Sequence, residues 1–365
     1  LVEDNDAGPT GQVFKNVSAK KCLARALEMA DWGQDLPNNE AMGVACGWWF
    51  TLPVPSGAYV KINVDGSATI ITGAQENGSG AVMALPVLAA EELGMHPDNF
   101  NILYQDTDAA PWDLGSQGSQ TTANNGRAVV EAAKVVRRQL LQLAAREMEV
   151  NPSDLEISEG LVRVRGAPSS TVAIKELAAK AHGGELLMGQ GSGTPPDLPD
   201  HNTSNCIGRL GYSAFAAPSF FCHVARLRVD RETGVVQVLE VSAVHDLGRV
   251  LNPIGAEGQI HGGVAHGIGM ALLEGTHFDK GKQLNPYLLD YKLQTVVDVP
   301  KINVDFVDSP AFEGGGPHGI KGAGEPPIVA TAGAIANAIY RSVGAKVNKL
   351  PMTPPRIWAT LNNVD

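Results

Sequence analysis

Glycines gather in a few stretches of this sequence, and these stretches limit how the chain can fold. The sequence has 41 glycines among 365 residues. A predicted helix at 254–273 contains six of them, including Gly258, Gly262, Gly263, Gly267 and Gly269. Each glycine costs a helix about 1 kcal/mol relative to alanine. A helix retains so many glycines when another backbone or a large ligand packs against it, so we predict such a close approach here.

A second constrained stretch, 320–327, reads Ile-Lys-Gly-Ala-Gly-Glu-Pro-Pro. Pro326 disfavours the α region for the residue before it, so we expect Glu325 to be extended. Pro327 is suited to begin a helix, which we expect to continue to about Val343. The stretch therefore predicts a carboxylate on a stiff turn at a helix N-terminus. By itself this pattern is more typical of a surface acid stabilised by the helix dipole.

Composition excludes several classes of protein. The net charge is −11 and no Lys/Arg cluster is present, so we expect no nucleic-acid partner. Hydrophobic residues make up 44% and charged residues 18%, as in soluble globular proteins, and from the 365 residues we expect two domains or subdomains. We expect no membrane span and no signal peptide. The four cysteines form no CxxC pair, so we expect neither an iron–sulfur cluster nor a structural zinc in this chain, and the cytoplasm is the default location.

Two polar, glycine-rich loops precede predicted helices. Gly73–Gly80 follows a predicted β-ribbon, which turns at Asp65-Gly66, and precedes a helix at 82–93. Residues 115–126 carry no charge and lead into an amphipathic helix at 127–148. The backbone N–H groups of such loops can bind phosphate. A plain turn in the first case, and a flexible loop in the second, are equally compatible with these residues.

The order of predicted elements indicates an α+β fold with two β–α subdomains, each with a mixed sheet flanked by helices. Residues 1–40 are polar and are expected to be an N-terminal connector with one helix at 19–32. Residues 41–205 are expected to form the first subdomain, which ends in a Gly-, Pro- and Ser-rich loop at 183–205. Residues 206–365 are expected to form the second, with strands at 219–229, 235–245, 288–295 and 302–307.

Four segments, in order, resemble the molybdenum-binding large subunit of the xanthine dehydrogenase and aldehyde oxidase family, the molybdenum hydroxylases. Gly73–Gly80 is similar to the family's Gly-Gly-x-Glu-x-Gly-Gln-Gly loop, and residues 118–122 resemble its Gly-Ser-Arg-Ser-Thr dinucleotide loop. Residues 246–269 resemble its Asp-x-Gly-x-x-x-Asn-Pro…Glu-Gly-Gln-x-His-Gly-Gly block. Residues 321–327 resemble the Lys-Gly-x-Gly-Glu motif that carries the catalytic glutamate.

This resemblance implies a molybdenum-cofactor-binding fold that holds molybdenum–molybdopterin in its cytosine dinucleotide form. It implies that Glu325 is the catalytic base in the oxidative hydroxylation of an N-heterocycle or aldehyde by a Mo–OH group, with hydride transfer to the metal centre. We expect Lys321 to lie near Glu325 and to favour its ionised form. The residues implied to bind the cofactor are Ser79, Gly80, Gly118, Ser119, Gln120, Thr121, Thr122, Asp246, Gln259, His266, Gly267, Lys321 and Gly324.

The resemblance also implies partners. It corresponds to the C-terminal half of the family's large subunit, so we expect a split subunit or fragment that works with the N-terminal half, an iron–sulfur subunit and an FAD-carrying flavin subunit. At three positions the family's Gln, Arg and Gln are replaced here by Ser79, Gln120 and His266. These replacements motivate an alternative, a catalytically silent structural or cofactor-carrying half-subunit. A stand-alone nucleotide-binding protein is a third possibility.

Overall fold

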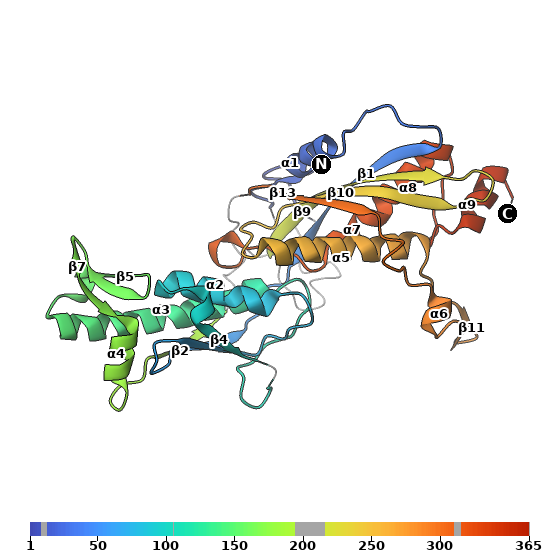
Figure 1. Ribbon diagram of the computed structural model, residues 1–365. Coiled ribbons are helices and arrows are strands. Elements are labelled where there is room, and N and C mark those ends of the chain that lie inside the picture. Colours follow the sequence, from blue (N-terminus) through green and yellow to red (C-terminus); the bar gives the residue numbers. More distant parts are fainter. Residues whose placement is uncertain (9–12, 105, 194–215, 310–314, 365) are drawn as a thin grey trace. The chain divides into compact units, whose positions relative to one another are not determined.

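The computed structural model describes residues 1–365 except 9–12, 105, 194–215, 310–314 and 365 (Figure 1). The chain divides into two compact units. Unit 1 comprises Leu1–Phe50, Pro218–Ala311 and Lys321–Asp365, and unit 2 comprises Thr51–Ala217 and Phe312–Ile320. Each unit combines helices with a four-stranded sheet that has both parallel and antiparallel pairs, so the predicted α+β class is confirmed.

Unit 1 is built on a sheet with the strand order β1-β9-β10-β13. These strands are β1 (Glu40–Thr51), β9 (Ala216–Val229), β10 (Val236–His245) and β13 (Lys301–Phe306), and only the ends of β1 and β9 pass into unit 2. β9 and β10 form the predicted antiparallel pair, whereas β10 and β13 run parallel.

Helices cover both faces of this sheet. Alternate residues of a strand point to opposite sides, so each face of the sheet has its own set of apolar residues. Leu227 and Val229 pack with α5 (Pro253–Leu272), α8 (Thr331–Val343) and α9 (Pro354–Asn362). Phe220 and Cys222 face the other side and pack with Cys22 and Ala26 of α1 (Ala19–Met29). Residues 1–40, expected to be a connector, therefore contribute a helix to the core of unit 1.

Unit 2 has a sheet with the strand order β4-β3-β2-β8. The strands are β2 (Gly57–Ile62), β3 (Ala68–Thr72), β4 (Phe100–Leu103) and β8 (Met188–Ser192). The predicted ribbon is confirmed: β2 pairs antiparallel with β3, with Ile62 opposite Ala68. Helices α2 (Ala81–Leu93) and α3 (Thr121–Met148) share one core with this sheet.

A smaller layer completes unit 2. Its antiparallel sheet has the order β5-β6-β7, formed by β5 (Leu155–Ser158), β6 (Leu161–Val164) and β7 (Ala167–Ala173), and α4 (Ile174–Ala181) follows. Leu155, Val162 and Leu177 bury these elements in the same core as α3. Short 3-10 turns lie at Pro97–Asn99, Pro152–Asp154 and Pro317–Gly319.

Three expected elements differ. The strand expected at 288–295 is wrong: this segment contains the short helix α6 (Leu288–Tyr291), none of whose residues is buried, preceded by the two-residue strands β11 (Phe278–Asp279) and β12 (Lys282–Gln283). The expected loop at 183–205 contains β8, which pairs with β2, and its remainder from residue 194 lies outside the described residues. The helix expected from Arg127 begins at Thr121.

Candidate active site

Glu325 immediately precedes the one-turn helix α7 (Pro326–Val329). Its backbone is helical, with φ −94° and ψ −30°, so the expected extended conformation is wrong. The carbonyl of Glu325 accepts a hydrogen bond from Ile328 N at 3.2 Å, which begins the helix and outweighs the preference imposed by Pro326. The single helix expected to reach Val343 is two helices, α7 and α8, with Ala330 between them.

The Glu325 side chain is half-buried and held by an indole. Trp49 Nε1 donates a hydrogen bond to Glu325 Oε2 at 2.8 Å. Trp49 lies on β1, and its ring stacks on Phe50 with 5.0 Å between centroids. Sequence reasoning missed Trp49 because it lies 276 positions from Glu325 and no local pattern connects them. The contact holds the carboxylate in one orientation at the start of a helix.

Lys321, which we expect to favour the ionised form of Glu325, forms a buried ion pair with Asp246. Lys321 Nζ lies 2.6 Å from Asp246 Oδ2 and 3.1 Å from Ser309 Oγ. Ser18 Oγ donates to the same carboxylate oxygen, and Gly248 N donates to Asp246 Oδ1 at 3.0 Å. The Lys321 and Asp246 side chains are 1% and 0% exposed. Two residues predicted to bind the cofactor thus form a buried ion pair between the end of β10 and the Glu325 stretch.

The close approach predicted for the glycine-rich helix is confirmed at two positions of α5. A Cβ on Gly263 would lie 2.4 Å from Pro327 Cβ, and one on Gly267 would lie 2.5 Å from Thr331 Cβ. Only glycine lets α5 come this close to the starts of α7 and α8. Gly258 and Gly262 instead face open space. On the same helix Gln259 is half-buried and His266 is exposed, whereas Gly324 is exposed beside Glu325.

A pair of buried histidines lies against α8. His223 Nε2 is 2.8 Å from His245 Nε2, and His223 Nδ1 is 3.1 Å from Thr331 Oγ1. Thr331 Oγ1 in turn donates to the carbonyl of Pro327 at 3.3 Å. Burial lowers the pKa of His223 to about 3; burial, together with the nearby His223, lowers the pKa of His245 well below its ordinary value. Both rings are therefore neutral at neutral pH. Sequence reasoning did not identify them.

In unit 2, the loop Gly73–Gly80 is closed by its own acid. The Glu76 carboxylate accepts hydrogen bonds from Gly78 N at 2.8 Å, Gly80 N at 2.9 Å and Val82 N at 3.2 Å. Ser79 Oγ lies 3.4 Å from the same carboxylate. The N-terminus of α2 thus already holds an anion from its own chain. The structure places Ser79 and Gly80 in this internal network, and their contact with a cofactor stays a prediction.

The second polar loop is fixed by buried amides. Gln120 is fully buried; its Nε2 donates to Gly115 O at 2.6 Å and its Oε1 accepts from Asn124 Nδ2 at 2.6 Å. Gly118 and Ser119 have positive φ values of 57° and 54°. A Cβ on Gly118 would lie 2.5 Å from Leu52 Cβ, so this turn requires glycine. The loop is consequently an ordered lead into α3, and the Gln120 side chain is used within it.

The N-terminus of α3 differs from that of α2. Among the residues that the structure describes, no side chain caps α3, and its first turn contains no acid. Thr121 is buried there, and Ser119 and Thr122 are half-buried. Because the first N–H groups of a helix are not bonded within it and carry partial positive charge, this end can receive an external anion. Of the two helix ends predicted to bind phosphate, that of α2 already holds the Glu76 carboxylate, and phosphate binding at that of α3 stays a prediction.

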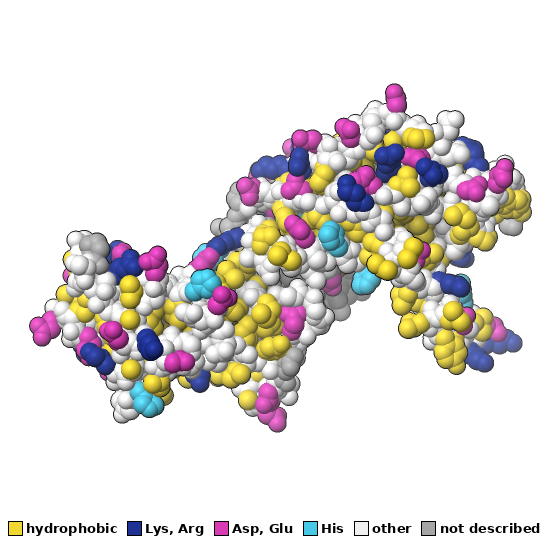
Figure 2. All heavy atoms as spheres, in the orientation of Figure 1, with side chains coloured by type: hydrophobic (Ala, Val, Ile, Leu, Met, Phe, Trp, Pro, Cys, Tyr) yellow, Lys and Arg dark blue, Asp and Glu magenta, His cyan; other side chains and the backbone are white. Residues whose placement is uncertain are grey.

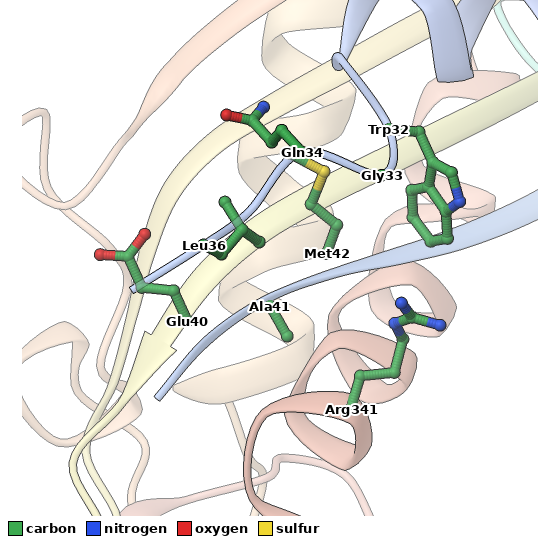
Figure 3. Close-up of a pocket in the computed structure, with 8 residues that line it drawn as sticks. All are labelled: Trp32, Gly33, Gln34, Leu36, Glu40, Ala41, Met42 and Arg341. Carbon is green, nitrogen blue, oxygen red and sulfur yellow. The ribbon is translucent and has the colours of Figure 1, made fainter. Parts of the chain in front are cut away.

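A separate hollow of about 410 Å³ lies in unit 1 between the segment 32–36 that follows α1, the start of β1, and α8 (Figure 3). The Arg341 guanidinium lies 4.9 Å from the centroid of the Trp32 ring. Glu40, on the rim, is buried and binds Arg226 and Arg228. No predicted site residue lines this hollow. Among the described residues, no group of three or more His, Cys, Asp or Glu is placed to hold a metal ion, and no helix has the length and apolar composition needed to cross a membrane.

Several known proteins are similar to this chain in sequence or in fold. A model of the molybdopterin cofactor-binding domain matches residues 23–300. The putative xanthine dehydrogenase molybdenum-binding subunit of Escherichia coli K12 is 31% identical over 378 residues, covering 97% of this chain and 48% of that protein. Subunit gamma of the 6-hydroxypseudooxynicotine dehydrogenase complex of Paenarthrobacter nicotinovorans is 30% identical, covering 82% of this chain and 37% of that protein. Quinoline 2-oxidoreductase from Pseudomonas putida 86 has the same fold, with a TM-score of 0.84 at 24% identity, covering 97% of this chain and 47% of that one.

These matches show that the chain has the fold of molybdenum-cofactor-binding proteins. The chain belongs to the molybdopterin cofactor-binding family, as the resemblance to molybdenum hydroxylases implied. It spans about half the length of the curated relatives it matches.

Proposed function

We propose that this chain is the C-terminal part of the molybdenum-binding subunit of a molybdenum hydroxylase that acts on an N-heterocycle or an aldehyde. The observation that carries the proposal is the Glu325 carboxylate, which stands at the start of α7 with Trp49 Nε1 2.8 Å from its Oε2. An acid fixed in this way, in a chain of this family, supports our assignment of Glu325 as the general base.

In this proposal the bound molybdenum–pterin group supplies the two-electron oxidation. Glu325 accepts the proton of the attacking oxygen nucleophile, and Trp49 keeps the carboxylate oriented for that transfer. Lys321 and Asp246 support the stretch from inside through their ion pair. Gln259, His266 and Gly324 remain proposed contacts to the cofactor from α5 and from the Glu325 turn, and Gly267 contributes by letting α5 approach Thr331.

We assign the phosphates of the dinucleotide, in its cytosine form, to the N-terminus of α3. The first turn, which no described side chain caps, the hydroxyls of Ser119, Thr121 and Thr122, and the left-handed turn at Gly118 support this assignment. Phosphate oxygens can accept from N–H and O–H donors, so the site needs no lysine. In contrast, the Glu76 carboxylate occupies the N-terminus of α2 and would repel a second anion.

The proposal includes partners, and an apolar surface of unit 1 supports one of them. Large apolar side chains are exposed along 284–297, and Figure 2 shows such side chains gathered where α6 lies. The exposed residues are Leu284, Tyr287, Leu288, Leu289, Leu293, Val296 and Val297. A surface of this kind is typical of an interface. Since the chain spans about half the length of its relatives, we propose that this apolar surface binds the remaining half of the molybdenum-binding subunit. Iron–sulfur and FAD subunits complete the proposed cytoplasmic complex.

The direct test of the base is Glu325→Gln in the assembled complex. We expect molybdenum content to be unchanged and kcat to fall at least about 100-fold, because the amide cannot take the proton. Glu232→Gln, which removes an exposed acid at a turn, is the matched control and should keep full turnover. Unchanged turnover in the Glu325 variant would remove the proposed base and favour a silent, cofactor-carrying half-subunit.

A further inference from the structure

The buried histidines belong to a chain of hydrogen bonds that ends on α7. The chain runs from His245 through His223 and Thr331 to the carbonyl of Pro327, with heavy-atom distances of 2.8, 3.1 and 3.3 Å. All three side chains are fully buried. Pro327 is the second residue after Glu325, so the chain ends on the backbone of the turn that positions the carboxylate.

The direction of this chain follows from its donors. A carbonyl can only accept, so the single hydroxyl hydrogen of Thr331 goes to Pro327 O, and Thr331 Oγ1 then accepts from His223 Nδ1–H. His223 Nε2 is left as the acceptor for His245 Nε2–H. The opposite direction would lose the bond to Pro327 and would leave a buried N–H of His245 unpaired, which is the rarer and costlier outcome.

The far end of the chain is closed. His245 Nδ1 is buried and has no hydrogen-bond partner among the described residues. The His245 ring stacks on Phe221, with 5.2 Å between centroids and 24° between planes. In the assigned direction this nitrogen carries no hydrogen. The two histidines therefore have one fixed pair of tautomers, Nε2–H on His245 and Nδ1–H on His223.

Helix α7 needs support of this kind. It has only four residues, and an isolated helical turn is unstable because its nucleation fixes several dihedral angles for one hydrogen bond. Gly263 and Gly267 allow α5 to press on Pro327 and Thr331 from one side. The histidine chain fixes the same two residues from the sheet.

We propose that His223 is a positioning residue for Glu325, which acts through Thr331 and the Pro327 carbonyl to set the orientation of α7. The proposal rests on the proposed function of Glu325 as the base. His223 and His245 take no part in proton transfer. Their neutral, hydrogen-bonded pair ties the first turn of α7 to the core of the sheet.

The test uses Thr331→Val and Thr331→Ser in the full chain, because these variants change the link without removing either ring. The readout is the Trp49 indole N–H resonance, assigned with Trp49→Phe among the five tryptophans, since this group donates to Glu325. We expect Thr331→Val to shift this resonance and to alter the imidazole nitrogen signals of His223, and Thr331→Ser to restore both. Thr360→Val is the control: it removes an equivalent bond, from Thr360 Oγ1 to the carbonyl of Arg356 in α9, and should leave both unchanged.

In the assembled enzyme, Thr331→Val should lower kcat about 10- to 100-fold with KM changed less than about twofold, and Thr331→Ser should restore kcat. An unmoved Trp49 resonance and unchanged kcat in a folded Thr331→Val variant would overturn the positioning role. Full turnover in Glu325→Gln would instead overturn the proposed function. The resonance of Trp49 would still decide whether the hydrogen bonds from His245 to Pro327 set the position of Glu325.

Discussion

Asp246 and Lys321 are both charged, and both are almost fully shielded from water. Removing one partner of a buried pair leaves the other charge uncompensated, which costs about 3–5 kcal/mol. We therefore expect Lys321→Met to lower the free energy of unfolding of the full chain by about that amount, measured by urea titration. The control is Lys301→Met, since Lys301 pairs with Glu240 at 3.2 Å but its side chain is 73% exposed. That variant should change stability by less than about 1 kcal/mol, and equal effects of the two variants would contradict the account.

The neutral histidine pair makes stability depend on pH. Because burial lowers the pKa of His223 to about 3 and that of His245 well below its ordinary value, the folded state binds fewer protons than the unfolded state below about pH 6.5. This contribution is complete above about pH 6.5 and is lost as the pH falls, with a slope of about 2.7 kcal/mol per pH unit for two protons. Urea titrations between about pH 6.5 and pH 5 should show the slope reduced by about one proton in His245→Asn. An identical slope in the variant would mean that the pair is not neutral.

At the scale of single residues, the sequence predicts a role for Glu325 because a specific motif surrounds it. Trp49 and the histidine pair could not be predicted, because they meet their partners across long stretches of chain. The motif predicts that Lys321 favours the ionised form of Glu325, but it does not predict the buried ion pair that Lys321 forms with Asp246. A sequence motif gives no information on which side chains are buried or which distant residues they contact.

Among the elements, α5 contains two kinds of glycine with opposite expected effects. Gly262→Ala places a Cβ in open space and should stabilise the chain by up to about 1 kcal/mol through helix propensity. Gly263→Ala would place a Cβ 2.4 Å from Pro327 and should destabilise it by about 1–3 kcal/mol. Urea unfolding of the two neighbouring variants measures both. If Gly263→Ala were as stable as Gly262→Ala, the close packing of α5 on α7 would be wrong.

Elements with a clear local sequence pattern are confirmed: α2 lies close to its predicted bounds, and β2 and β3 form the predicted antiparallel ribbon. The pattern fails where tertiary contacts decide. Residues 121–126 are too polar to be predicted as helix, but Asn124 and Asn125 find buried partners in Leu52 O, Asp113 and Thr72. The segment at 288–295 has strand-like composition, but its large apolar side chains are exposed and it pairs with no strand of the described residues.

At the scale of the whole molecule, the apolar surface at 284–297 is a testable interface. Leu289 is 83% exposed on this surface, and Leu186, in unit 2, is 84% exposed. We expect Leu289→Asp to reduce co-purification of the remaining half of the molybdenum-binding subunit, because the aspartate must be desolvated at the interface. Leu186→Asp, matched in exposure, should leave co-purification unchanged. Equal recovery with both variants would place the interface elsewhere.

The most direct test of the account is to purify the untagged chain from its source and to assay the same fraction for molybdenum, released cytosine nucleotide and associated polypeptides. We predict about one molybdenum per chain, an equal amount of cytosine nucleotide, and a second polypeptide or segment that supplies the remaining half of the molybdenum-binding subunit. A pure chain with no molybdenum, no cytosine nucleotide and no associated polypeptide would contradict the proposal, and Glu325 would lose its assigned role.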